Sequence, residues 1–310
     1  MKRIGKLQNG LTICLLILLS GCTQEEPVQK VDLTKREEVR IKEEKNVITY
    51  AYLPQYSHRL AYQRHFMLLD FLRKETGLNI KQIFPDTFDE HMKMVGQGKI
   101  DISYTNPFNY TKIARRHGAK AFARTIEIYG REKFRGQIIC RADNRAIQSI
   151  EDCRGKRWIA VDSTSAGGYL YCLGLFMSHG IRKEDFSEVA FAPGPGGKQE
   201  KVVLAVYTGK YDVGSIREGT LSVVSDKIDV TKIKILTHTP WYPGWLFAAR
   251  ANLDDDIVES IRRAFIKLDD TRPEHHRILK QAGFTGIISS TDRDYDPVRT
   301  LVLQLGIDRD

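Results

Sequence analysis

The chain has 310 residues, of which 42% are hydrophobic and 28% charged, and its formal net charge is +9. This composition is ordinary for a globular protein and excludes a disordered or collagen-like chain. The basic excess suits anionic ligands. However, the sequence has no zinc-ligand spacing, helix-turn-helix signature or block of basic and aromatic residues, so we expect no nucleic-acid partner.

The N-terminus is typical of a bacterial lipoprotein signal. A short basic region precedes the apolar run Leu11–Leu19, which is about half as long as the ~20 residues that a membrane-spanning helix needs. The following Ser20-Gly21-Cys22 completes a close resemblance to the lipobox, which implies cleavage before Cys22 and lipidation of its thiol and amine. We therefore expect a signal peptide at 1–21, a charged tether at 22–46, and an extracytoplasmic protein held on the membrane by lipid.

From Val47 onward, segments rich in β-branched and aromatic residues alternate with segments of helical periodicity. This alternation predicts right-handed β-α-β units and mixed, mostly parallel sheets in an α/β fold. The expected strands are 47–53, 78–84, 100–104, 121–128, 137–140, 158–161, 189–192, 211–216, 234–236 and 246–249. The expected helices include 66–72, 88–96, 111–118, 170–177, 198–208, 255–268 and 274–282.

Two polar or aromatic stretches, 141–145 and 238–245, indicate connections between two lobes. The first lobe is then formed by 47–141 together with the returning segment 241–310, and the second lobe by 142–240. Because ligands in such sheets bind beyond the carboxyl ends of the strands, we expect the site in a cleft between the lobes.

The turn Ser163-Thr164-Ser165 follows an apolar strand and precedes Gly167 and a helical run. Free N–H groups at a helix start carry a partial positive charge, and three hydroxyls beside them can donate to an oxyanion. The turn is therefore a candidate phosphate or phosphonate cradle. An ordinary helix cap is the alternative, because Ser and Thr are the usual capping residues.

Three further polar turns follow expected strands and are predicted to converge with the hydroxyl turn: Pro54–Tyr56, Tyr104–Asn106 and Asp212–Glu218. For Tyr56 and Tyr104, a role as core or rim aromatic residues is as compatible with the sequence as a role in the site. Asp212 and Glu218 are likewise compatible with surface carboxylates that have no role in the site. Three nearby aromatic residues could either line the cleft or pack at the hinge, and we expect the hinge: Trp241, Tyr242 and Trp245.

Between Val47 and Leu268 the chain resembles the phosphate-, phosphite- and phosphonate-binding lipoproteins of ABC transporters, which have the two-lobed type II periplasmic binding protein fold. The segments that carry this resemblance are Gly98-Lys-Ile-Asp-Ile-Ser-Tyr-Thr-Asn-Pro-Phe-Asn-Tyr110, Ile147-Gln-Ser-Ile-Glu-Asp-Cys-Arg-Gly-Lys-Arg-Trp158, Asp162-Ser-Thr-Ser-Ala-Gly167 and Val202-Val-Leu-Ala-Val-Tyr-Thr-Gly-Lys-Tyr-Asp212, followed by Gly214.

The resemblance implies that the hydroxyl turn holds the oxyanion and that the two carboxylates accept protons from a protonated phosphonate or a ligand ammonium. The implied ligand-binding residues are Tyr56, Tyr104, Thr105, Asn106, Ser163, Thr164, Ser165, Asp212 and Glu218. The chain departs from the family at Gln199, where a His is frequent, at Ala166, and at Thr105-Asn106, which precede Pro107 in place of an apolar residue and Gly. These departures leave the identity of the ligand open.

The sequence thus predicts a solute-binding lipoprotein that captures a small oxyanion for an ABC permease and ATPase. A sensory partner of a membrane signalling kinase is the alternative. A third class is an enzyme on the same fold, such as one for a thiamin precursor. We expect no catalysis, because a nucleophile elbow is absent and Ser165 has no identifiable His partner.

No cofactor or metal is expected, since the cysteines and the pair His275-His276 lack ligand spacing. Of the five cysteines, three lie in the expected folded part: Cys140, Cys153 and Cys172. A disulfide between Cys140 and Cys153 and buried free thiols are both compatible with the sequence.

Overall fold

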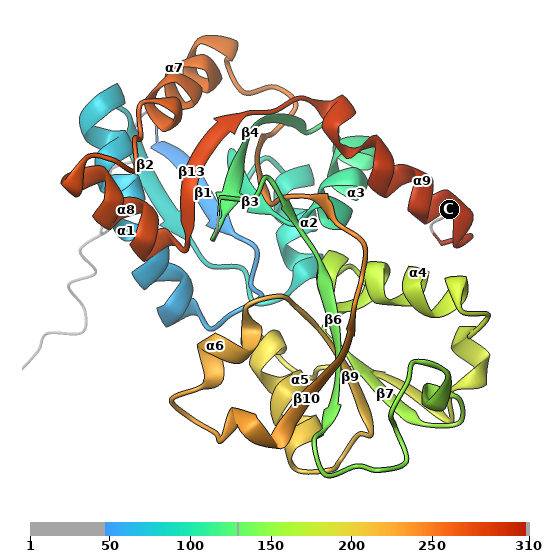
Figure 1. The fold of residues 1–310 in the computed structure, drawn as a ribbon. Helices are drawn as coiled ribbons and strands as arrows, with labels where there is room; N and C mark the ends of the chain where they lie inside the picture. Colours follow the sequence, from blue (N-terminus) through green and yellow to red (C-terminus); the bar gives the residue numbers. More distant parts are fainter. Residues whose placement is uncertain (1–46, 129, 308–310) are drawn as a thin grey trace, which may run out of the picture. The chain divides into compact units, whose positions relative to one another are not determined.

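The computed structural model describes residues 47–128 and 130–307, which form two lobes (Figure 1). The predicted signal peptide, Cys22 and the tether lie outside these residues. Among the described residues, no helix has the length and apolar character needed to cross a membrane.

The first lobe contains a six-stranded sheet with the order β13-β4-β12-β3-β1-β2. Its strands are β1 (Val47–Tyr52), β2 (Asn79–Ile83), β3 (Ile102–Thr105), β4 (Lys120–Glu127), β12 (Leu246–Ala249) and β13 (Phe284–Ser289). The second lobe contains a five-stranded sheet with the order β10-β6-β9-β7-β8. Its strands are β6 (Gly136–Arg141), β7 (Arg157–Ala160), β8 (Glu188–Phe191), β9 (Val213–Arg217) and β10 (Ile233–His238).

Both sheets are mixed, with parallel and antiparallel parts. The strands joined through helices are parallel, as predicted: β1 with β2 and β3, and β7 with β8 and β9. The strands next to the two connections form antiparallel pairs. In the first lobe β4 leaves the lobe and its neighbour β12 enters it, and in the second lobe β10 leaves and its neighbour β6 enters. The expectation of mostly parallel sheets therefore holds only away from the two connections.

The helices are α1 (His58–Thr76), α2 (Phe88–Gly96), α3 (Pro107–His117), α4 (Tyr171–Ser178), α5 (Lys198–Tyr207), α6 (Thr220–Val224), α7 (Asp255–Ile266), α8 (Pro273–Ala282) and α9 (Asp296–Gln304). Helix α3 begins four residues earlier than the sequence predicted. Asn106 caps it by accepting a hydrogen bond from the Asn109 N–H at 2.9 Å. Pro107, at the first helical position, has the backbone angle that a helix start requires.

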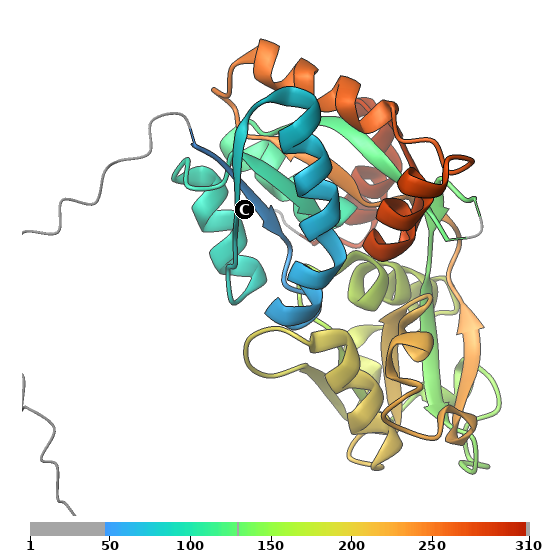
Figure 2. The ribbon, with the colours of Figure 1, turned by 90° about the vertical axis from the view of Figure 1, so that its left-hand side faces the viewer.

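Two segments, 128–135 and 239–245, connect the lobes (Figure 2). They pair through the short strands β5 (Lys133–Phe134) and β11 (Tyr242–Pro243). The predicted boundary after residue 141 falls later than the observed connection, because β6 already pairs with β9 and β10 in the second sheet. The polar stretch 141–145 is instead the turn that follows β6.

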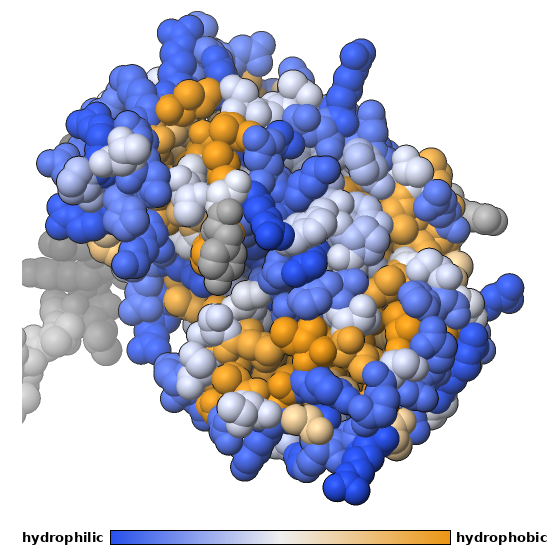
Figure 3. All heavy atoms as spheres, in the orientation of Figure 1, coloured by the Kyte–Doolittle hydropathy of each residue, from blue (hydrophilic) through white to orange (hydrophobic). Residues whose placement is uncertain are grey.

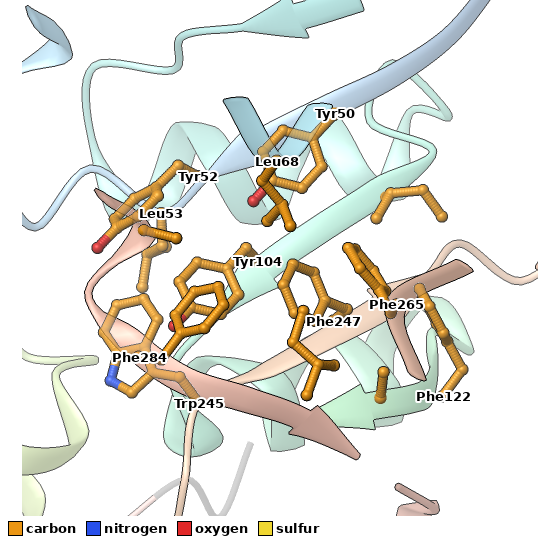
Figure 4. Packing of buried hydrophobic residues seen from close by; sticks show 14 of the residues in the cluster. Tyr50, Tyr52, Leu53, Leu68, Tyr104, Phe122, Trp245, Phe247, Phe265 and Phe284 are labelled. Carbon is orange, nitrogen blue, oxygen red and sulfur yellow. The ribbon is translucent and has the colours of Figure 1, made fainter. Parts of the chain in front are cut away.

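The core of the first lobe is rich in aromatic side chains, including Tyr50, Tyr104 and Phe247 (Figure 4). This core continues across the lobe boundary, where Tyr171 of the second lobe joins the same cluster. Helix α4 also packs closely on α9, because a Cβ added at Gly174 would lie 2.8 Å from Leu301 Cδ1. Apolar packing therefore joins the lobes on this side of the molecule.

Cys140, Cys153 and Cys172 are buried and unbridged, so the structure has the free thiols rather than the disulfide. Burial raises the pKa of Cys153 to about 12, and burial also raises the pKa of Cys172 well above its ordinary value. These thiols are consequently protonated at neutral pH and serve as small apolar core residues.

We predict that Gly136→Ala destabilises the protein by about 1–3 kcal/mol, because overpacking costs this much. The new Cβ would lie 2.3 Å from the Gly167 carbonyl oxygen and 2.8 Å from Cys172 Sγ. Thermal unfolding followed by circular dichroism measures the change. Gly286→Ala is the control, since its nearest neighbour is the movable Cδ1 of Ile126 at 3.1 Å. Equal melting temperatures for the two variants would contradict this packing.

Candidate functional site

A cavity of about 870 Å³ lies between the lobes, beyond the carboxyl ends of β1, β3 and β9. This is the position at which open α/β sheets bind their ligands. Seven basic side chains line it: Arg59, Arg64, Arg131, Lys133, Arg135, Arg217 and Lys227. Four acidic side chains also line it: Glu127, Glu200, Glu218 and Asp226. The excess of basic groups favours an anionic occupant.

Arg217, the last residue of β9, places a guanidinium group in this cavity. Its Nη2 donates to Glu127 Oε2 at 2.7 Å, and both side chains are nearly buried, with exposed fractions of 10% and 14%. The rings of Phe134 and Trp245 lie 5.3 and 5.2 Å from the guanidinium carbon. The Arg217 N–H donates to Gln199 Oε1 at 3.0 Å. The charge is thus held in a fixed position.

Glu127 ends β4 in the first lobe, so its pair with Arg217 joins the two lobes. Burial raises the pKa of Glu127 above its ordinary value, although Arg217 and Arg64 oppose this effect. Its Oε1 is buried and has no hydrogen-bond partner among the described residues. The carboxylate therefore occupies one side of Arg217, and a bound anion would compete with it there.

Arg64 and three tyrosines form the wall contributed by the first lobe. The Arg64 guanidinium lies over the Tyr56 ring, 4.6 Å from its centroid. The Tyr52 and Tyr104 rings meet edge to face at 5.1 Å, and Gln55 Nε2 donates to the Tyr52 hydroxyl at 2.8 Å. Burial raises the pKa of both Tyr52 and Tyr104, so these phenols stay protonated and able to donate.

The predicted hydroxyl turn does not line the cavity and lies where the lobes meet. Asn106 Nδ2 of the first lobe donates to the Thr164 carbonyl at 3.3 Å. Ser165 caps the segment Ala166–Leu170, with its Oγ accepting from the Gly168 N–H at 3.2 Å. Thr164 Oγ1 donates to Asp162 at 2.9 Å, while Ser163 is exposed. The turn thus caps a helix, and its role in ligand binding remains a prediction.

The other predicted residues fall into two groups. Tyr56, Tyr104 and Glu218 line the cavity, and Arg135 holds Glu218 through hydrogen bonds of 2.7 and 3.0 Å. Thr105 and Asp212 do not line it.

Thr105 is buried in the first lobe, where its Oγ1 accepts from Asn109 Nδ2 at 2.8 Å. Asp212 lies at the opposite end of β9 from Arg217, because the strand runs from Val213 towards the cleft. It accepts hydrogen bonds from Arg157, and these hold the pKa of Asp212 below its ordinary value.

Among the cavity residues that sequence reasoning missed, four are central to the site: Tyr52, Arg64, Glu127 and Arg217. Three of them end strands, so a search of strand ends for polar groups would have found Tyr52, Glu127 and Arg217. Arg64 lies inside α1, and its spacing carries no signal that distinguishes it from a solvent-facing helical residue. Across the described ranges, no group of three or more His, Cys, Asp or Glu side chains is placed to hold a metal.

Comparisons with known proteins show the family and the fold of the chain. Residues 50–295 match the family model described as "ABC transporter, phosphonate, periplasmic substrate-binding protein". The phosphate-import protein PhnD of Mycolicibacterium smegmatis is 23% identical over 304 residues, covering 92% of this chain and 92% of that protein.

A solved structure of PhnD1 from Prochlorococcus marinus, in complex with methylphosphonate, has the same fold, with a TM-score of 0.75 and 14% identity. The match covers 84% of this chain and 98% of that one. The tetrathionate sensor histidine kinase TtrS of Salmonella typhimurium is 25% identical over 194 residues, which are 59% of this chain but 33% of that kinase. Because the family model spans most of the folded part, the chain belongs to the family of periplasmic substrate-binding proteins of phosphonate ABC transporters.

Proposed function

We propose that this protein binds a small oxyanion of the phosphonate, phosphite or phosphate class in the cleft and delivers it unchanged to an ABC permease. The observation that carries this proposal is the convergence of donors from both lobes on one cavity. Arg64 and the tyrosines belong to the first lobe, and Arg217 belongs to the second.

These groups suit a tetrahedral oxyanion. A guanidinium presents planar, paired N–H donors that match two oxygens at once. Phenolic hydroxyls that remain protonated add neutral donors beside it. In a cavity shielded from water, each hydrogen bond to a charged group contributes about 1.5–3 kcal/mol. An anion held between Arg64 and Arg217 would therefore draw the lobes together, and the permease would recognise that closed form.

We extend this proposal to the hydroxyl turn Ser163–Ser165, with Thr105 and Asn106 facing it from the first lobe. The segment Ala166–Leu170 continues into α4, so its first N–H groups point out of a longer helical stretch. The lobes meet here through the hydrogen bond from Asn106 to Thr164 and through apolar packing of Ala166 against the first lobe. Parting of the lobes would expose the turn to an incoming oxyanion.

The family description supports transport over sensing, and the likeness to TtrS covers only a third of that kinase. We further propose that Cys22 carries the lipid that holds the protein on the outer face of a bacterial membrane. The motif before Cys22 supports this, since a lipidated tether keeps a binding protein close to its permease.

We predict that Arg64→Ala weakens the binding of methylphosphonate or phosphate by about 10- to 100-fold, because a charge-assisted hydrogen bond is lost. Isothermal titration calorimetry measures the dissociation constant. Arg59→Ala is the control, because Arg59 lies on the same helix and the same cavity but is exposed at its rim. Equal effects of the two variants would mean that general charge, rather than the buried site, attracts the anion.

For the hydroxyl turn, we predict that Ser163→Ala combined with Ser165→Ala weakens phosphate and methylphosphonate binding at least tenfold. Loss of the Ser165 cap costs about 1 kcal/mol of stability, so a modest fall in melting temperature is expected alongside. Calorimetry and thermal unfolding measure the two effects. Unchanged affinity in this variant, with a large loss in Arg64→Ala, would assign the oxyanion to the arginines alone.

A third prediction concerns Glu127→Gln, which removes the carboxylate that competes for Arg217. Like charges a few ångströms apart repel by about 4 kcal/mol at an effective dielectric constant of ~20, so we expect at least tenfold tighter methylphosphonate binding near pH 7. The variant without ligand should melt lower, because it leaves Arg217 without its buried partner. Weaker binding in Glu127→Gln would instead mean that Glu127 contacts the ligand directly.

Comparing the wild type with Glu127→Gln also predicts how ligand binding depends on pH. The raised pKa of Glu127 means that its carboxylate becomes protonated as the pH falls towards that value, which frees Arg217 in the wild type. The ratio of the two dissociation constants, wild type over Glu127→Gln, should therefore fall towards one in acid. At each pH the two proteins meet the same mixture of ligand ionisation states.

A further inference from the structure

The cavity is much larger than a simple oxyanion, and both polar and apolar side chains line it. Its volume is about 870 Å³, whereas methylphosphonate fills only on the order of 100 Å³, taking ~30 Å³ for each water-sized group. Cavities of roughly 300–1,000 Å³ are those that enclose drug-sized molecules. With the lobes as they stand in this structure, an oxyanion between Arg64 and Arg217 leaves most of this volume for another part of the ligand, and closure would bring the cavity walls onto that part.

Four aliphatic side chains line the same cavity and keep part of their surface exposed to solvent. Leu221 and Val223 of α6 are half-buried there, Ile235 of β10 is 37% exposed, and Ile128 of the first connection is 52% exposed. Figure 3 shows apolar surface gathered on the second lobe, below the junction with the first. We call these four residues the apolar wall. The wall is continuous with the polar end, because both line one cavity.

The neighbouring charges at the mouth already have partners. The Arg131 and Arg135 guanidinium carbons lie 4.4 and 4.3 Å from the Trp241 ring centroid, and Glu218 pairs with Arg135 at 2.7 Å. Lys227 likewise pairs with Glu200 at 2.8 Å. These pairs fix the rim, so the exposed apolar surface beside them is the part of the cavity that gains most from contact with a ligand.

We infer that the ligand is a phosphonate or phosphate monoester whose apolar substituent of several carbons lies against the apolar wall. This inference rests on the proposed function, because the oxyanion must first occupy the arginine end. The substituent would cover Leu221, Val223, Ile235 and Ile128 and thereby remove apolar surface from water. The wall then selects among oxyanions by the size of the group attached to phosphorus.

The test measures the dissociation constants of methyl-, propyl- and hexylphosphonate by calorimetry. Because burial of one methylene contributes about 0.8 kcal/mol, the affinity should rise by up to about fourfold per methylene. The heat-capacity change on binding should become more negative along the series. Methylphosphonate that binds as tightly as hexylphosphonate, or more tightly, would overturn the inference while leaving the proposed function intact. Failure of all three to bind would overturn the inference, and failure of phosphate and phosphite as well would overturn the proposed function.

A pair of matched variants locates the effect. In Ile235→Ser, the gain in affinity from methyl- to hexylphosphonate should be several-fold smaller than in the wild type. The affinity for methylphosphonate should stay the same. Leu204→Ser is the control, because Leu204 is a similarly exposed aliphatic residue of the same lobe, at 39%, and does not line the cavity. Melting temperatures verify that both variants are folded. If the affinity rises equally with substituent length in Ile235→Ser and in Leu204→Ser, the apolar wall is excluded as the contact surface.

Discussion

The ion pair between Glu127 and Arg217 joins the two lobes at the base of the cleft, and the character of the site depends on it. Each residue ends a strand, one in each sheet, and each is nearly buried. A buried charge is costly unless it is paired, so these two groups hold each other in place. The cation that would serve an oxyanion is therefore present, oriented and already neutralised before any ligand arrives.

This neutralisation sets what the site can accept. Because Glu127 satisfies one side of Arg217, an anion that reaches the pair meets both an attraction and a repulsion. Arg64 adds a second positive charge at this end of the cavity, where its guanidinium lies over the Tyr56 ring. The site thus prefers a ligand whose charge is small or that brings a proton to Glu127. This agrees with a family described by phosphonate transport, because the oxygens of a phosphonate change protonation near neutral pH.

Local sequence patterns predicted much of the fold, and the reasons for the exceptions are physical. The expected bounds 88–96 and 246–249 coincide with α2 and β12, because cap residues and a compact apolar run mark them. Strand β13 was missed, since Gly286 interrupts a short and weakly alternating segment.

The residues of the site were likewise predictable where the signal was local and were missed where it was not. Tyr56, Tyr104 and Glu218 were predicted because turn chemistry is local, whereas Glu127 and Arg217 are 90 residues apart and meet only when the lobes are assembled. Asp212 was grouped with Glu218, yet the strand between them separates the two residues, because one precedes β9 and the other follows it.

The two sides of the lobe junction differ in chemistry, and this difference limits how the protein can move. On one side, Tyr171 and the α4–α9 contact bury apolar groups in a core shared by both lobes. On the other side lies the cavity, where charged and hydroxyl-bearing groups face each other and the ion pair between Glu127 and Arg217 joins the lobes. Close-packed apolar contacts resist sliding, so relative motion of the lobes is expected to pivot about the shared core. Such a pivot would open the cleft on the side where Arg59 and Lys227 lie, and it would also change the spacing of Arg64 and Arg217. Ligand charge, rather than ligand size, would then decide closure, and the apolar wall would decide which of the charged ligands is retained.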